Sequence, residues 1–176
     1  MRQCTKLRQS LSNKRIFIKE NITSADAIIL NLLQKDAKLG LDVLAYETGL
    51  SVASVERRLK SLRTRKLILG DVAIVDPVKV GLPMTFIVLV ELERERIDQI
   101  DAFIRRAQDE PLVQQCYYVT GEADFCLICV AKSMFDFEDL TKRLFFENSN
   151  VRRFRTSVAM GNKKVSLKIP VEPNVT

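Results

Sequence analysis

A chain of 176 residues with 47% hydrophobic residues and a mean hydropathy near zero can bury one good core or two small ones. Its longest uncharged apolar runs are far shorter than the roughly 20 residues that a helix needs to cross a bilayer, which excludes a membrane-spanning protein. The basic and polar residues 2–19 do not resemble a secretory signal, so we expect the protein in the cytoplasm.

The net charge of +6 is unevenly distributed. Residues 1–70 hold 14 Lys or Arg against 6 Asp or Glu, which gives +8, whereas residues 71–176 hold 14 against 16, which gives −2. Like charges crowded in one region repel each other, and binding to a polyanion that releases its counterions is the usual compensation. The charge distribution therefore indicates nucleic acid as the first candidate partner.

The residue types that most catalytic sites need are missing. The chain contains no histidine, and thus neither the commonest general base near neutral pH nor the commonest nitrogen ligand of metals. Cys126 and Cys129 have the spacing of a metal or redox pair, but residues three apart on a strand point to opposite faces, so we interpret them as small buried side chains. We expect no catalytic residue, no cofactor and no metal.

Residues 1–20 indicate a mostly flexible basic arm, and residues 21–70 a domain of three helices. The first helix, with a hydroxyl cap at Thr23 or Ser24, is predicted to end near Asp36. Its apolar residues recur at helical spacing: Ala25, Ile28, Ile29, Leu32 and Leu33. The second helix is predicted over residues 41–47, and Gly49 supplies the left-handed residue that ends it.

The third helix, predicted from Val52 to Lys66 after a cap at Ser51, has two unlike faces. The apolar face holds Val52, Val55, Leu59 and Leu62. The other face is small, hydroxylated and cationic, which suits entry into the major groove, where Arg reads guanine edges and hydroxyls bond phosphates. The residues expected to contact DNA are Ser51, Ala53, Ser54, Arg57, Arg58, Lys60, Ser61 and Thr64. Arg57 is the main candidate and Arg58, nearer the apolar side, is expected to reach a phosphate; the alternative is an ordinary solvated face.

Beyond this domain, residues 68–77 have the composition of a wing or linker strand, and residues 71–83 are assigned to a linker. The pattern then predicts strands at 84–92, 112–120, 124–131 and 150–160, helices at 97–108 and 135–146, and a further strand at 163–169. The two helices carry apolar stripes: Ile97, Ile100, Phe103, Ile104 and Ala107, and then Phe137, Leu140, Leu144 and Phe145. The order β-α-β-β-α-β predicts an α+β protein with a ferredoxin-like sandwich over residues 84–170, before a tail at 171–176.

Four stretches between Ile22 and about Pro170 follow the pattern of one known family. They are Asp26-Ala-Ile-Ile-Leu-Asn-Leu-Leu, Thr48-Gly-Leu-Ser51 followed by Val55-Glu-Arg-Arg-Leu59, Asp76-Pro77 with Gly81, and Tyr118-Val-Thr-Gly121-Glu-Ala-Asp124-Phe. In these the chain resembles the leucine-responsive regulatory protein/AsnC family, the feast/famine regulators. The resemblance implies a sequence-specific transcriptional regulator with a winged helix-turn-helix on double-stranded DNA, and an effector domain whose sheets pair into homodimers and often into rings of dimers.

The resemblance also implies an effector, an amino acid or a related metabolite, near the loop from Gly121 to Asp124. The implied effector-binding residues are Gly121, Glu122, Asp124, Thr156 and Ser157. Backbone amides near Gly121 would hold a carboxylate, and Asp124 or Glu122 would take an ammonium group. From the residues alone, a Gly and an Asp between two strands are equally ordinary hairpin material.

Two questions stay open at the level of the sequence. Alternation places Arg153 and Arg155 on one face of the last strand and Arg152 on the other, which fits a subunit contact, an effector anion or solvent alike. The alternative function is an architectural DNA-coating or metabolite-binding oligomer without strong sequence specificity, which competitor DNA would titrate away.

Overall fold

The computed structural model describes residues 20–94, 96–147 and 150–174. These residues form two compact units, divided after Val72 and again after Ser166, so the segment from Leu167 onward belongs to the same unit as the N-terminal helices. This division differs from the expected one, in which residues up to 170 belong to the second domain. None of the described helices is long and apolar enough to span a membrane.

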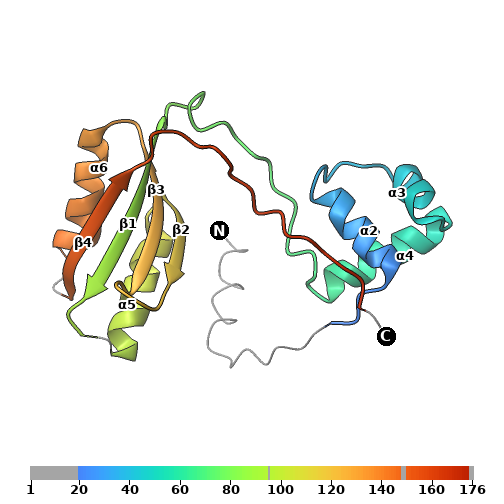
Figure 1. Cartoon of the computed structure of the whole chain (residues 1–176), viewed down its shortest axis with the longest axis horizontal. Coiled ribbons are helices and arrows are strands. Elements are labelled where there is room, and N and C mark those ends of the chain that lie inside the picture. Colours follow the sequence, from blue (N-terminus) through green and yellow to red (C-terminus); the bar gives the residue numbers. More distant parts are fainter. Residues whose placement is uncertain (1–19, 95, 148–149, 175–176) are drawn as a thin grey trace. The chain divides into compact units, whose positions relative to one another are not determined.

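The first unit holds three helices, α2 (Ser24–Leu33), α3 (Leu41–Thr48) and α4 (Val52–Thr64) (Figure 1). The expected caps are present, since the hydroxyls of Thr23 and Ser51 accept hydrogen bonds from the first turns of α2 and α4. Gly49 ends α3 with a φ of +67°, a conformation that costs glycine little because it has no Cβ.

Seven buried residues from all three helices form the core of this unit: Ile29, Leu30, Leu44, Ala45, Val55, Leu59 and Leu62. The predicted inner face of α4 is confirmed at Val55, Leu59 and Leu62, but Val52 in the first turn is 47% exposed. In α2 the predicted stripe is wrong at Ile28, which is exposed. Three aliphatic residues in a row, 28–30, leave the rotation of a helix ambiguous, and packing here buries Ile29 and Leu30.

The residues after α4 form a C-cap with an unusual occupant. The amide of Leu67 donates to the carbonyl of Leu62 at 2.9 Å and the amide of Lys66 to that of Arg63 at 3.0 Å, the bonds of a Schellman motif. Such a motif places one residue in the left-handed region, and Lys66 has a φ of +59°. A side chain with a Cβ therefore occupies a position that favours glycine.

Two predicted strands are not formed. The range 68–77, expected as a wing or linker strand, and the range 163–169, expected as a tail strand, contain no strand. Both have the alternating apolar residues of strands, but a strand also needs a partner for its backbone groups, and in the described chain neither range has one.

The second unit is a four-stranded antiparallel sheet with two helical segments (Figure 1). Its elements are β1 (Met84–Leu92), α5 (Ile97–Asp109), β2 (Val113–Tyr118), β3 (Phe125–Ala131), α6 (Met134–Thr141), the π-helix η1 (Lys142–Phe146) and β4 (Val151–Val158). The strand order β2-β3-β1-β4 is that of a ferredoxin-like sandwich, as predicted.

The helices cover one face of the sheet. Alternate residues of the two central strands point into this core: Phe86, Val88, Val90 and Leu92 from β1, and Phe125, Leu127, Cys129 and Ala131 from β3. The Phe86 ring stacks on Phe137 of α6, with centroids 3.8 Å apart. The prediction that Ile97 belongs to the inward apolar stripe of α5 is wrong, because this first residue of the helix is 79% exposed.

We expect Lys66→Gly to raise the free energy of unfolding of the first unit by about 0.5–1 kcal/mol, because glycine relieves the left-handed Cβ at some cost in unfolded-chain entropy. Urea denaturation followed by helical circular dichroism measures the change. Lys66→Ala is the matched control, since it removes the same charge and keeps the Cβ. Equal stability of the two variants would contradict the explanation.

Candidate functional site

The outward face of α4 is solvent-exposed, as the helical pattern predicts. Arg57 and Lys60 lie on it one turn apart, and both are exposed. Among the described residues, neither side chain has a hydrogen-bond or ion-pair partner. Ala53 and Ser61 are also exposed and bring no bulk to this face. Unpartnered cations on a face without large side chains can approach a phosphate backbone or base edges.

The hydroxyl groups of α4 have local bonds. Ser51 accepts from the amide of Ser54 at 3.3 Å and donates to its hydroxyl at 2.9 Å. Thr64 donates to the carbonyl of Lys60 at 2.8 Å. Each of these hydroxyls keeps acceptor capacity, and Ser54 keeps a donor, so the caps do not exclude contacts with DNA.

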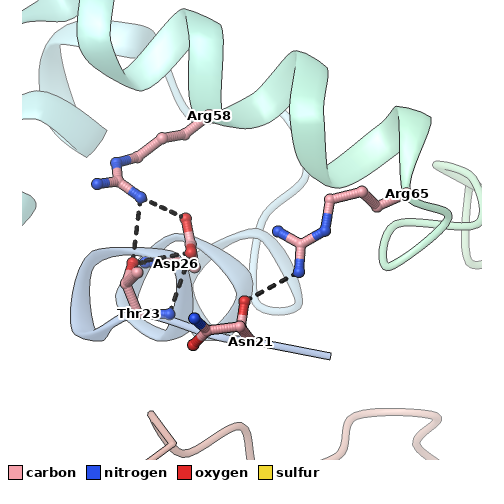
Figure 2. A network of polar contacts seen from close by, with 5 residues as sticks. All are labelled: Asn21, Thr23, Asp26, Arg58 and Arg65. Atoms are coloured by element: carbon pink, nitrogen blue, oxygen red, sulfur yellow. Dashed lines mark hydrogen bonds and ion pairs between the residues drawn. The ribbon is translucent and has the colours of Figure 1, made fainter. Parts of the chain in front are cut away.

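Arg58 points from α4 towards the start of α2 (Figure 2). Its Nη1 donates to Asp26 Oδ1 at 2.9 Å and to Thr23 Oγ1 at 3.1 Å. Asp26 Oδ2 in turn accepts from the amide of Thr23 at 3.1 Å and from its hydroxyl at 2.8 Å. Arg58 thus has partners inside its own unit, and a contact with a phosphate stays a prediction.

Asp26 is the key residue that pattern reasoning missed. It is buried, with only 4% of its surface exposed. Burial raises the pKa of Asp26, but the hydrogen bonds from Thr23 and the ion pair with Arg58 outweigh it, so the pKa lies below its ordinary value of 3.8. The signal was available, because Thr-x-x-Asp before an apolar run is a capping-box pattern.

Arg65, at the C-terminal end of α4, holds the chain just before α2 (Figure 2). It donates to Glu20 Oε2 at 2.7 Å and to the carbonyl of Asn21 at 2.9 Å. Two guanidinium groups about two turns apart, Arg58 in α4 and Arg65 at its C-cap, thus bind residues 20–26. The rotation of α4 about its axis is therefore fixed by polar contacts as well as by its apolar side.

In the second unit, the loop between β2 and β3 is held by Asp124. Its Oδ2 accepts from the amide of Leu92 at 2.6 Å, and its own amide donates to Val90 at 2.9 Å. Gly121 has a φ of +122°, which a side chain would rarely allow. Glu122, by contrast, extends into solvent, with its side chain 86% exposed.

Beside this loop, four charged side chains lie on the face of the sheet that the helices do not cover. Arg155 Nη2 lies 3.3 Å from Glu122 Oε2 and 3.5 Å from Glu91 Oε1, and Arg153 Nε lies 2.8 Å from Glu91 Oε2. Glu91 is half-buried, with 14% of its side chain exposed, and its Oε1 has no hydrogen-bond partner in the described residues. The expected shared face of Arg153 and Arg155 is confirmed.

The structure separates Thr156 from Ser157. Thr156 pairs with Val88, whose side chain is in the core, so Thr156 lies on the helix side of the edge strand β4. Ser157 pairs with Ile87 on the open face, the face of Arg155 and Glu122. Of these two hydroxyl residues, only Ser157 lies on the same face as the loop.

The cysteines of β2 and β3 do not all lie on one face of the sheet. Cys129 is buried in the core and Cys126 lies on the opposite face, as the spacing predicts. Burial raises the pKa of Cys116 to about 11 and that of Cys129 to about 12. In the described part of the chain, no group of three or more His, Cys, Asp or Glu could hold a metal ion.

Comparison with known proteins identifies both units. A family profile for the Lrp/AsnC ligand binding domain matches residues 85–169, and one for a winged helix-turn-helix DNA-binding domain matches residues 26–68. An uncharacterized HTH-type transcriptional regulator of Sinorhizobium fredii is 45% identical over 148 residues, 84% of this chain and 88% of the relative. The chain belongs to the Lrp/AsnC family of transcriptional regulators.

Solved structures of Lrp/AsnC regulators share the fold. An AsnC family transcriptional regulator from Agrobacterium tumefaciens superposes with a TM-score of 0.80 at 27% identity, over 85% of this chain and 97% of the other. A feast or famine regulatory protein from M. tuberculosis, crystallised in complex with L-methionine, gives a TM-score of 0.75 at 27% identity, over 84% and 97%. These confirm the predicted helix-turn-helix and effector-domain architecture.

We expect Asp26→Asn to lower the free energy of unfolding at pH 7 by about 1–3 kcal/mol, because Arg58 loses its buried counter-ion and α2 part of its cap. The pKa of Asp26 is lowered on folding, so this stabilisation is full above the unfolded value of 3.8 and is lost as the pH falls through the lower folded value. Urea denaturation from pH 7 down to pH 2 should show the gap between wild type and variant closing. Asp101→Asn, which removes an exposed carboxylate, is the control. A gap independent of pH would contradict the assignment.

Proposed function

We propose that this chain is a sequence-specific DNA-binding regulator whose α4 enters the major groove, and whose sheet unit binds an amino acid. The observation that carries the DNA contact is the exposed pair Arg57 and Lys60, which lack partners in the described chain. The opposite side of the same helix is held by the bond from Arg58 to Asp26. Arg57 is the base-reading candidate and Lys60 a phosphate contact. Ser51, Ala53, Ser54, Ser61 and Thr64 complete the surface, and Arg58 acts mainly as a positioning residue.

For the effector, we infer a zwitterion at the loop that follows β2. Arg155 and Glu122 place opposite charges 3.3 Å apart beside this loop, which matches the carboxylate and the ammonium group of an amino acid. An amino acid can exchange partners, its carboxylate taking Arg155 and the amides near Gly121, and its ammonium group taking Glu122. Asp124 holds the loop through the amide of Leu92, and Ser157 lies on the same face. The L-methionine complex of the M. tuberculosis relative supports this ligand class.

The uncovered face of the sheet is the proposed contact for a second copy of the chain. Ile87 and Tyr117 on it are 41% and 49% exposed, beside half-buried Leu89, Ile128 and Val130. Within the described residues of this unit, nothing covers these side chains. An apolar sheet face pairs well with an identical face across a two-fold axis, so a homodimer is the proposed unit, with rings of dimers as a further step.

Regulation then requires that effector and DNA each bind one state of the assembly better than another. A protein of this type, without catalytic function, would act in the cytoplasm. The second candidate function is an architectural DNA coat, which the exposed Lys66 after α4 favours because it adds phosphate affinity without base reading.

We expect Arg57→Gln to weaken binding to DNA fragments recovered with the protein by about 5- to 150-fold, because a base contact is worth about 1–3 kcal/mol. Lys60→Gln should weaken specific and non-specific binding alike and lower the slope of log affinity against log salt by about 1. Fluorescence anisotropy over a salt series, with circular dichroism to show that folding is intact, measures both effects.

Lys35→Gln, an exposed charge change outside α4, serves as the control and should leave affinity nearly unchanged. Equal affinity of wild type and the two α4 variants at moderate salt would refute the DNA interface. Loss of the complex to excess competitor DNA at the same rate for every sequence would favour the architectural coat.

We expect titration calorimetry of the intact protein against the twenty amino acids to give a binding signal for at least one, and Glu122→Gln or Arg155→Gln to weaken it by about tenfold or more, since each removes a charge-assisted bond. Arg105→Gln on the exposed side of α5 is the control for a lost guanidinium group. Absence of a calorimetric binding signal for all twenty amino acids would count against an amino-acid effector.

A further inference from the structure

The C-terminal residues 167–174 lie along α2 in the first unit (Figure 1). Gln34 binds the backbone of Ile169 in both directions: its Nε2 donates to the carbonyl at 3.0 Å and its Oε1 accepts the amide at 2.8 Å. Asn31 does the same with Val171, at 2.7 Å and 3.2 Å. Two side-chain amides of a helix therefore offer the donors and acceptors that the edge of a β-sheet would offer.

The spacing of the two partners explains why this match works. Asn31 and Gln34 are three apart and lie on the same face of α2, while Ile169 and Val171 are two apart and present their backbone groups on the same side of an extended chain. Pro170 stands between them and has no amide to leave unpaired.

The prolines also prepare the segment for docking. Pro170 and Pro173 fix their own φ angles and restrict the residues before them to extended conformations. A segment that is already extended loses less conformational entropy when it binds. The sequence of the tail thus suits docking better than free movement.

Residues 171–174 make further apolar and polar contacts with the first unit. The Val171 side chain packs against the core of the first unit. Beyond it, Asn174 donates from its backbone amide to the carbonyl of Ile22 at 2.9 Å and from Nδ2 to that of Glu20 at 2.7 Å. These carbonyls belong to the stretch that Arg65 of α4 also holds.

We propose that α2 carries a docking site for an extended peptide, built on Asn31 and Gln34, and that its occupant is residues 167–174 of the same chain. The helix-turn-helix unit is then joined to the sheet unit by two stretches of chain, residues 73–83 before β1 and residues 159–166 after β4. Because β4 carries Arg155 and Ser157, the second stretch leads from the proposed effector site to a helix that supports α4. That last consequence rests on the proposed function, whereas the docking does not.

Amide hydrogen exchange of the intact protein, followed by NMR, tests the docking. The amides of Ile169, Val171 and Asn174 should exchange at least about tenfold more slowly than in a free peptide of the same sequence, because each donates a hydrogen bond. In the double variant Asn31→Leu/Gln34→Leu, protection at Ile169 and Val171 should fall to free-peptide rates. Gln108→Leu on α5, which removes an exposed amide elsewhere, should change nothing in the tail.

Free-peptide rates in the wild type, or rates unchanged by the double variant, would overturn the docking site. Protection that disappears on dilution would assign the occupant to a second copy of the chain and overturn the assignment to the same chain. Retained amide protection at Leu59 and Leu62 shows that the double variant still folds. DNA binding measured on the same samples separates the two proposals, since a protein with a protected tail and no DNA affinity would contradict only the proposed function.

Discussion

A carboxylate buried at the start of α2 determines where the cationic face of α4 points. The apolar side of α4 rests on only three buried residues, Val55, Leu59 and Leu62, and such a contact tolerates small rotations and slides. The charge-assisted bond between Asp26 and Arg58 is directional and tolerates much less. The proposed base contact of Arg57 would need its side chain placed to within about half an ångström, and the buried ion pair restricts the rotation of α4 on which that placement depends.

Helix α2 is therefore more than a structural layer. Its N-terminal turn orients α4 through Asp26, and its C-terminal half binds the backbone of the chain's last residues through Asn31 and Gln34. The two sets of contacts lie about one to two turns apart on the same helix.

Local patterns in the sequence were sufficient where a feature depends on neighbours along the chain. The two faces of α4, its Ser51 cap and the opposite orientations of Cys126 and Cys129 all follow from helical or strand periodicity. The strands expected at 68–77 and 163–169 were wrong because propensity says nothing about the presence of a partner strand.

Long-range polar contacts could not be predicted, because local patterns carry no information about partners that are distant in the sequence. The bond between Asn31 and Val171 spans 140 residues, and no periodicity links an amide on a helix to a backbone carbonyl so far away. The Arg155 pairing with both Glu91 and Glu122 likewise depends on the register between β1 and β4 and on the position of the loop between β2 and β3, which the residue pattern leaves open. The positions of the candidate DNA contacts were predictable, whereas the inward attachment of Arg58 was not.

Two thiols on the helix-covered side of the sheet, one buried and one partly buried, bear on how this protein responds to oxidants. Burial raises the pKa of Cys116 to about 11 and that of Cys129 to about 12, which keeps both groups in the thiol form at neutral pH. Oxidants attack the thiolate, so the raised pKa values disfavour oxidation of these two thiols in the folded protein. Cys126 lies on the open face of the sheet, and pairing of that face with a second chain would shield it from peroxides as well.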